Sequence, residues 1–156
     1  IIPDGKGYWK KTDPRIDRNN ITTLNQSLDG NLLNVIRLVK YWNREKSIGI
    51  DSSYLLETMI INFYSQPNSS CTTFVDIEFI KVVNYLRSAI LHDVQDLKGI
   101  QGNLNNYTFT ERFNISLSIE NYYNLSVKAR EYESTDIEEC FKKWKEILGG
   151  NFPNYE

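Results

Sequence analysis

The sequence has few of the residue types on which many metal and redox sites depend, with two cysteines and one histidine in 156 residues. Cys71 and Cys140 lie far apart, so neither a disulfide framework nor a zinc-binding spacing is available to them and to His92. We expect both cysteines to be free thiols in a reducing cytoplasm. His92 has no partner at a recognisable spacing, and we expect it to be a helix-end residue.

Neither sign of charge is in large excess. The sequence has 18 Lys and Arg residues and 20 Asp and Glu residues, which gives a formal net charge of -2. Proteins that track the phosphates of a duplex normally show a clustered basic excess, so this balance argues against such a partner. The sequence also lacks an apolar run of membrane-spanning length, and IIPDGKGYW at the start has no signal-peptide pattern. We expect no duplex nucleic acid and no membrane as partners, and a cytoplasmic location.

What the chain does have is apolar residues at helical spacing, with 40% hydrophobic residues overall, enough for one domain with a sizeable core. The clearest stretch runs from Leu32 to Glu57. A turn at Gly49 divides it, and Asp51 or Ser52 can cap the helix that follows. Before the turn, one apolar stripe is formed by Leu32, Val35, Ile36, Val39 and Trp42.

The same pattern predicts helices over about 13–28, 52–64, 73–91 and 135–148, the last with a capping box at Thr135 and Glu138. Phe113, Ile115, Leu117 and Ile119 alternate as in a strand, but helical spacing returns downstream and we predict a helix there. We therefore expect a mainly α fold. It comprises an extended or hairpin lead-in over residues 1–12 and one domain of about six helices over 13–156.

Three residues of the central stretch suit a nucleotide. Lys40 lies on the flank of the apolar stripe, where its ammonium can reach a neighbouring groove, and Ser53 and Tyr54 open the next helix. Helix N-terminal amides, a hydroxyl and an ammonium fit a phosphate chain, and the Tyr54 ring offers a stacking face for a base. From spacing alone, the commoner roles of these three residues are a surface lysine, a helix cap and a core aromatic.

Five short motifs carry a resemblance to a known family. WKKTDP, RLVKYWN, SSYLLE, GIQGNLN and WKEILGGNFP occur in this order along the chain. Together they resemble the C-terminal half of bacterial cGAS/DncV-like nucleotidyltransferases (CD-NTases), the cyclic-oligonucleotide synthases. The resemblance implies that Lys40 and Ser53 contact the triphosphate of a bound NTP, ATP or GTP, and that Tyr54 contacts its base.

The resemblance also implies a catalytic half that is missing here. The family binds two Mg²⁺ ions through a Gly-Ser motif, an Asp-x-Asp motif and a third Asp on an N-terminal sheet. This sequence has no Gly-Ser pair, and Asp4 and Asp13 match no member of that triad. We expect a fragment, beginning at Ile1, whose residues 1–12 edge the missing sheet. Its partner would be the N-terminal half, with Mg²⁺ held only in the full-length enzyme and not by this chain.

The intact protein would then join NTPs into a cyclic oligonucleotide that signals phage infection. A different class of function also fits the sequence, a non-catalytic helical module that kept the fold and binds a partner protein through its apolar faces. A nucleotide-binding assay separates the two. A third possibility, an enzyme of the same superfamily that makes linear products or modifies RNA, is disfavoured because the sequence shows no basic patch.

Overall fold

The computed structural model describes residues 2–3, 9–10 and 14–156, with side chains from residue 18 onward. Two short strands, β1 (Ile2–Pro3) and β2 (Trp9–Lys10), pair antiparallel. The predictions on Asp4, Asp13 and residue 1 lie outside the described residues. Over the described part the chain forms six helices: α1 (Pro14–Ser27), α2 (Leu32–Glu45), α3 (Ser53–Tyr64), α4 (Val75–Ala89), α5 (Phe109–Tyr132) and α6 (Ile137–Leu148).

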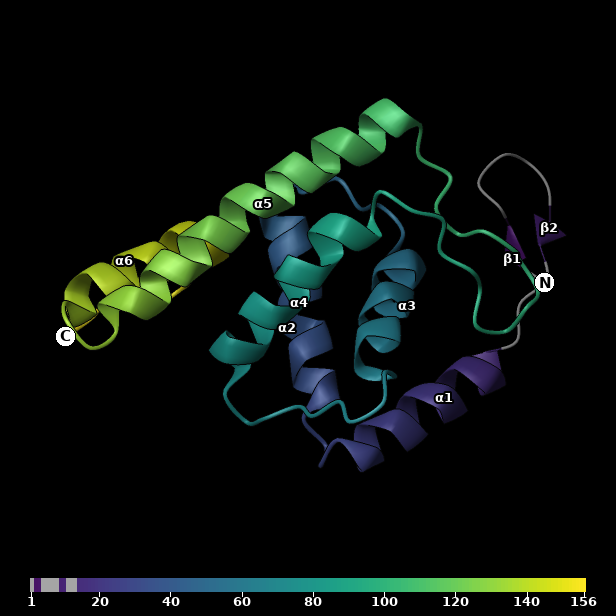
Figure 1. The fold of residues 1–156 in the computed structure, drawn as a ribbon, viewed down its shortest axis with the longest axis horizontal. Helices are drawn as coiled ribbons and strands as arrows, with labels where there is room; N and C mark the ends of the chain where they lie inside the picture. The colour runs from purple at the N-terminus through teal and green to yellow at the C-terminus, as the bar shows by residue number, and fades with distance from the viewer. Residues whose placement is uncertain (1, 4–8, 11–13) are drawn as a thin grey trace.

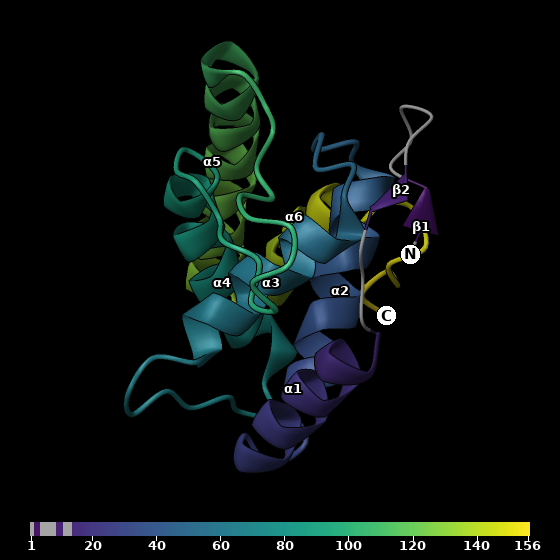
Figure 2. The same ribbon diagram turned by 90° about the vertical axis from the view of Figure 1, so that its right-hand side faces the viewer.

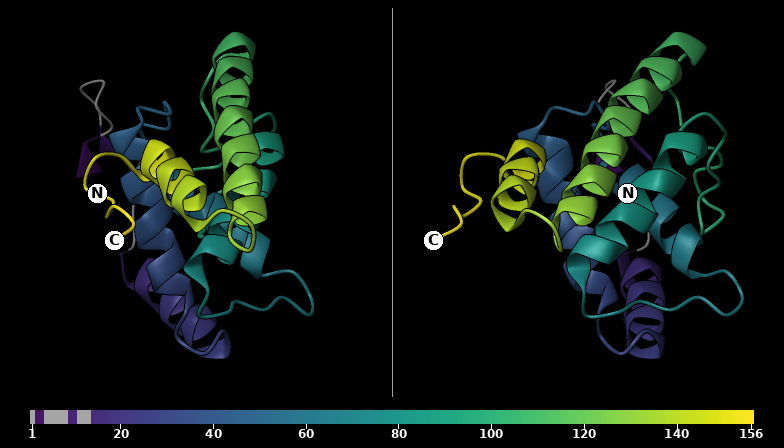
Figure 3. Two further views of the ribbon diagram at one scale, coloured as in Figure 1. Left: turned by 90° about the vertical axis from the view of Figure 1, so that its left-hand side faces the viewer. Right: turned by 60° about the vertical axis from the view of Figure 1, so that its left-hand side comes forward.

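The prediction of a mainly helical fold with about six helices is confirmed. α5 is the longest helix and runs along one edge of the molecule, with α4 and α6 packed against it (Figure 1). α1 lies at the opposite side and contacts α2 and α3 (Figure 2). α6 turns back beside the C-terminal part of α5, as both views of Figure 3 show. None of the helices in the described ranges is both long and apolar enough to cross a membrane.

α2 is the central helix of the core, as its apolar stripe predicts. Leu32, Val39 and the other members of the stripe are buried, and Trp42 has no exposed surface. The Trp42 ring meets the rings of Phe79 from α4 and Tyr122 from α5 edge-on, at centroid distances of 5.4 and 5.7 Å. These contacts join rings from three helices and so help to fix the position of α2 in the core.

The strand-like alternation at residues 113–119 is explained by two faces of one helix. Ile115 and Ile119 are buried, whereas Phe113 and Leu117 are 49% and 44% exposed. Each pair is four residues apart, so each forms its own stripe along α5, one facing the core and one facing outward. The helix prediction is confirmed, and the helix starts with a capping box in which the Thr108 side chain accepts from the Glu111 amide.

The start of α6 differs from the prediction by one residue. The cap is Asp136, whose carboxylate accepts a hydrogen bond of 3.1 Å from the Glu139 amide, and not Thr135. Two neighbouring residues, a threonine and an aspartate, can each cap the helix N-terminus, and the backbone conformation before the helix determines which of them does. The end of the helix is as predicted, because Gly149 takes a φ of 91° that favours glycine.

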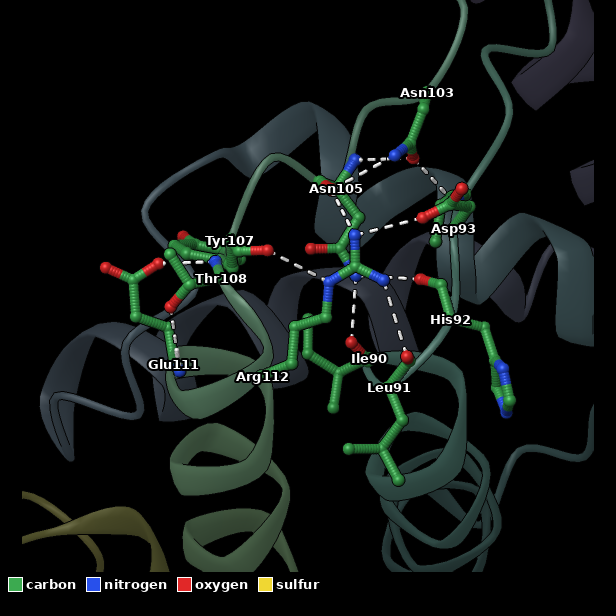
Figure 4. Close-up of polar contacts among 11 residues, drawn as sticks. Ile90, Leu91, His92, Asp93, Asn103, Asn105, Tyr107, Thr108, Glu111 and Arg112 are labelled. Atoms are coloured by element: carbon green, nitrogen blue, oxygen red, sulfur yellow. Dashed lines mark hydrogen bonds and ion pairs between the residues drawn. The ribbon is translucent and has the colours of Figure 1, made fainter.

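The segment between α4 and α5 has little regular structure but is densely hydrogen-bonded (Figure 4). Arg112 donates to the carbonyls of Leu91, Asn105 and Tyr107 and to the Asp93 carboxylate, at 2.7 to 3.3 Å. The buried Asn105 amide in turn donates to the carbonyls of Ile90 and His92. These contacts order the loop, and His92 lies just after the end of α4, near the helix-end position that the sequence predicts.

Candidate functional site

The turn between α2 and α3 is held in place by one side chain of α2. The Asn43 amide donates to the Ile50 carbonyl at 2.8 Å and accepts from the Ile50 amide at 3.3 Å. Gly49 adopts a φ of 106° within this turn, and a Cβ there would approach Ile115 of α5 to 3.3 Å. The sequence signal at Gly49 therefore marks both a left-handed backbone and a close approach between helices.

α3 begins where the sequence predicts. Ser52 is the cap, and its hydroxyl accepts from the Leu55 amide at 3.2 Å. Ser53 is the first helical residue and is exposed. The first amides of an α-helix have no acceptor within the helix and carry the positive end of its dipole. The Ser53 hydroxyl therefore lies where a negatively charged group is stabilised.

A cavity of about 390 Å³ opens beside this helix start. Lys40 and Ser53 both line it, although they come from different helices. Arg44 lies one helical turn after Lys40 on α2 and also lines the cavity. Its wall is completed by Asn43, Ser47, Gly49, Ile50, Asp51 and Leu56.

The Lys40 ammonium is engaged by a carboxylate of α3. Its Nζ donates to Oε1 of Glu57 at 2.6 Å, which joins α2 to α3. The two side chains are 38% and 23% exposed, so the pair is in contact with solvent and contributes little to stability. We interpret Glu57 as a residue that pairs α3 with α2.

Tyr54 does not line the same cavity. Its hydroxyl donates to the Asp96 carboxylate, and the Lys98 ammonium lies 4.6 Å from the centroid of its ring. The ring lines a smaller cavity of about 50 Å³ together with Glu57, Thr58 and Leu97, among others. Adjacent residues of a helix point about 100° apart, which explains why Ser53 and Tyr54 face different surroundings.

Asp96 organises the loop that covers Tyr54. In addition to the hydrogen bond from the Tyr54 hydroxyl, its carboxylate accepts hydrogen bonds of 2.9 to 3.1 Å from the backbone amides of Lys98, Ile100 and Gln101. Burial alone would raise the pKa of Asp96, but these hydrogen bonds outweigh it and hold the pKa below the usual range. A carboxyl with a lowered native pKa stabilises the fold above its unfolded-state pKa, and this stabilisation is lost as the pH falls through the native value.

Asp96→Asn is expected to loosen this loop, because the amide side chain keeps the shape and loses the charge that four donors surround. Hydrogen exchange at the amides of Lys98, Ile100 and Gln101 should speed up by an amount corresponding to about 1.5–3 kcal/mol of local stability. In the wild-type protein the same stabilisation should begin to decline below the unfolded-state pKa, about 3.9, and should be lost as the pH falls through the lower native value.

The matched control is Asp93→Asn, which removes a carboxylate that is 62% exposed in the same loop and whose partner Arg112 keeps three backbone acceptors. It should leave exchange at those three amides unchanged. Equal protection in Asp96→Asn and in the wild-type protein would show that the Asp96 charge does not hold the loop.

Two residues that the sequence spacing did not identify, Tyr107 and Arg44, contribute to the cavity or to its rim. Tyr107, just before α5, accepts a hydrogen bond of 2.8 Å at its hydroxyl from the Asp51 amide and so fixes the rim. Its sequence neighbours give no signal for this contact, which joins residues 56 positions apart. Arg44 could have been found, because it follows Lys40 by four residues in a predicted helix.

The arrangement suits an anion. Two cationic side chains, a hydroxyl and a helix N-terminus border one cavity, with the Asp51 carboxylate as an opposing charge. Across the described ranges, no three His, Cys, Asp or Glu side chains gather closely enough to hold a metal ion. The described residues therefore do not supply the carboxylate set that a Mg²⁺ pair requires.

No family model matches the chain. The chain is 39% identical, over its whole length, to a probable cyclic nucleotide synthase of Bacillus cereus (strain VD146). It spans 46% of that relative's length, so the alignment leaves more than half of the relative unmatched. The chain is thus similar, from end to end, to part of a probable cyclic nucleotide synthase.

Proposed function

We propose that this chain is the helical nucleotide-recognition half of a bacterial cyclic-oligonucleotide synthase. The observation that carries the proposal is the cavity shared by Lys40 and Ser53, in a chain similar throughout to a probable cyclic nucleotide synthase. Both residues line this cavity at the start of α3, and an ammonium and a hydroxyl beside a helix N-terminus suit a phosphate group. The ligand would be an NTP, ATP or GTP.

The contribution of these residues is positioning. Lys40 and Ser53 would neutralise and orient the phosphates, and Arg44 would add a second cation one turn along α2. Tyr54, which lines the neighbouring smaller cavity and whose hydroxyl is held by Asp96, would contact the base through its ring. Holding reactants in a fixed geometry can account for a large part of a phosphoryl-transfer rate without any covalent step at these side chains.

The bond-forming chemistry would belong to the rest of the full-length protein. An N-terminal catalytic half would supply the carboxylates for Mg²⁺, which when bound neutralises charge that develops on the transferring phosphate. The product would be a cyclic oligonucleotide that acts in antiphage signalling, made in the cytoplasm. Residues 1–12 would lie against the edge of the catalytic sheet.

The proposal is tested by comparing this chain with the full-length protein. With ATP, GTP and Mg²⁺, the full-length protein should form a cyclic product and this chain alone should form none, because its sequence lacks the Gly-Ser and Asp-x-Asp motifs that would supply the metal ligands. Chromatography of the reaction mixtures measures both. Product from the isolated chain, or full-length protein that binds neither nucleotide, would contradict the proposal.

One observation favours the second candidate, a protein-interaction module. Phe109, Phe113 and Leu117 follow one another every four residues on α5 and are 78%, 49% and 44% exposed. Such an outward apolar stripe is typical of a contact surface. This candidate requires no nucleotide, so its signature is full-length protein that captures a partner through α5 while ATP and GTP fail to bind.

A further inference from the structure

Glu57 occupies a position from which it acts on the phosphate site without lining it. It lies four residues after Ser53 on α3, and therefore on the same face of that helix. Its Oε1 accepts a hydrogen bond of 2.6 Å from the ammonium of Lys40, which itself lines the cavity. An ammonium has three donors, so Glu57 leaves the others available for a second acceptor.

Two opposite effects on an anion follow from this contact. The hydrogen bond restricts a long, flexible side chain and keeps its ammonium at the junction of α2 and α3, where the cavity opens. The carboxylate, however, brings a negative charge to within a few ångströms of any phosphate that Lys40 binds. Because both side chains are partly exposed, solvent screens this repulsion to about a five- to tenfold effect on affinity.

We propose that Glu57 is a positioning residue of the nucleotide site, which fixes the Lys40 ammonium at the cavity and limits the affinity of that cavity for phosphates. The inference rests on the proposed function, because it takes the ligand of Lys40 to be a phosphate chain. It assigns the ion pair a role in binding, in addition to joining two helices.

Two substitutions separate the charge of Glu57 from its hold on Lys40. Glu57→Gln keeps an oxygen that accepts from the ammonium and removes the charge, so ATP should bind the full-length protein about five- to tenfold more tightly. Glu57→Ala removes the charge and the acceptor together. It should bind ATP at least threefold more weakly than Glu57→Gln, because Lys40 is then no longer held.

The same two substitutions in a Lys40→Ala background show whether Glu57 affects ATP binding through its hydrogen bond with Lys40. In that background Glu57→Gln and Glu57→Ala should bind ATP equally, since no ammonium remains to be positioned. Glu146→Gln is the control for net charge, because its carboxylate pairs with Lys143 on α6 and does not line the cavity. It should bind ATP as the parent does.

The outcomes distinguish this inference from the proposed function. If the parent binds ATP and Lys40→Ala weakens that binding, but Glu57→Gln brings no gain, the inference is overturned and the proposed function stands. A difference between Glu57→Gln and Glu57→Ala that persists without Lys40 overturns it as well. If the parent does not bind ATP or GTP, both fail together. The inference is supported if Glu57→Gln binds ATP more tightly than the parent and if the difference between Glu57→Gln and Glu57→Ala disappears without Lys40.

Discussion

Lys40→Ala in the full-length protein is expected to weaken ATP binding tenfold or more. The substitution removes an ammonium that lines the cavity at the start of α3, and with it a charge-assisted hydrogen bond to phosphate. Such a bond contributes about 1.5–3 kcal/mol, which corresponds to at least a tenfold change in affinity. Isothermal titration of ATP measures the change.

The control for this prediction is Arg37→Ala. Arg37 lies on the same helix, is exposed and does not line the cavity, so its removal changes the net charge equally. ATP affinity should fall less than twofold. The fold should survive both substitutions, because the Lys40 ion pair is partly exposed. Equal losses in the two variants would mean that net charge, and not a contact from Lys40, governs binding.

Glu78→Ala is expected to lower the free energy of unfolding by about 1–3 kcal/mol, the usual cost of leaving a buried hydrogen-bonding group without its partner. The Glu78 side chain is fully buried. It accepts from the Tyr64 hydroxyl at 2.6 Å, from the Thr72 amide at 3.1 Å and from Lys81 at 3.0 Å. Alanine would leave the buried Tyr64 hydroxyl without this acceptor.

The same group makes stability depend on pH. Burial would raise the pKa of Glu78, but the donors from Tyr64, Thr72 and Lys81 outweigh it and hold the pKa below the usual range. Its contribution is therefore complete above the unfolded-state pKa, about 4.3, and is lost as the pH falls through the lower native value. Chemical denaturation at neutral pH and in acid measures both effects.

Glu138→Ala is the matched control, since its carboxylate is 67% exposed on α6 and pairs only loosely with Lys142, at 3.4 Å. It should change the unfolding free energy by less than about 0.5 kcal/mol. A Glu78→Ala variant as stable as this control would show that the buried network around Glu78 does not hold α4 to the preceding loop.

The helices could be predicted because their signal is local. The α2 stripe and the turn at Gly49 follow from spacing and from one residue type, and the structure bears out both. The alternation along α5 was ambiguous, because Ile115 faces the core and Phe113 faces outward while both are apolar. Burial distinguishes the two faces, and the sequence pattern does not contain it.

The candidate site could be predicted only in part, for a related reason. Lys40 and Ser53 lie in one short stretch whose helix, turn and helix cap could each be predicted from local sequence. The structure shows that both residues line one cavity. Asp96 and Tyr107 fix Tyr54 and the cavity rim through contacts across 42 and 56 positions. No periodicity reports such contacts, because they depend on where the loop after α4 returns to α3.

The most direct test of the account is a crystal structure of the full-length protein with a non-hydrolysable ATP analogue. The account predicts phosphate oxygens within about 3 Å of Lys40 Nζ and Ser53 Oγ, with the base against the ring of Tyr54. An analogue bound with its phosphates away from the start of α3, and Lys40 still paired only with Glu57, would contradict it.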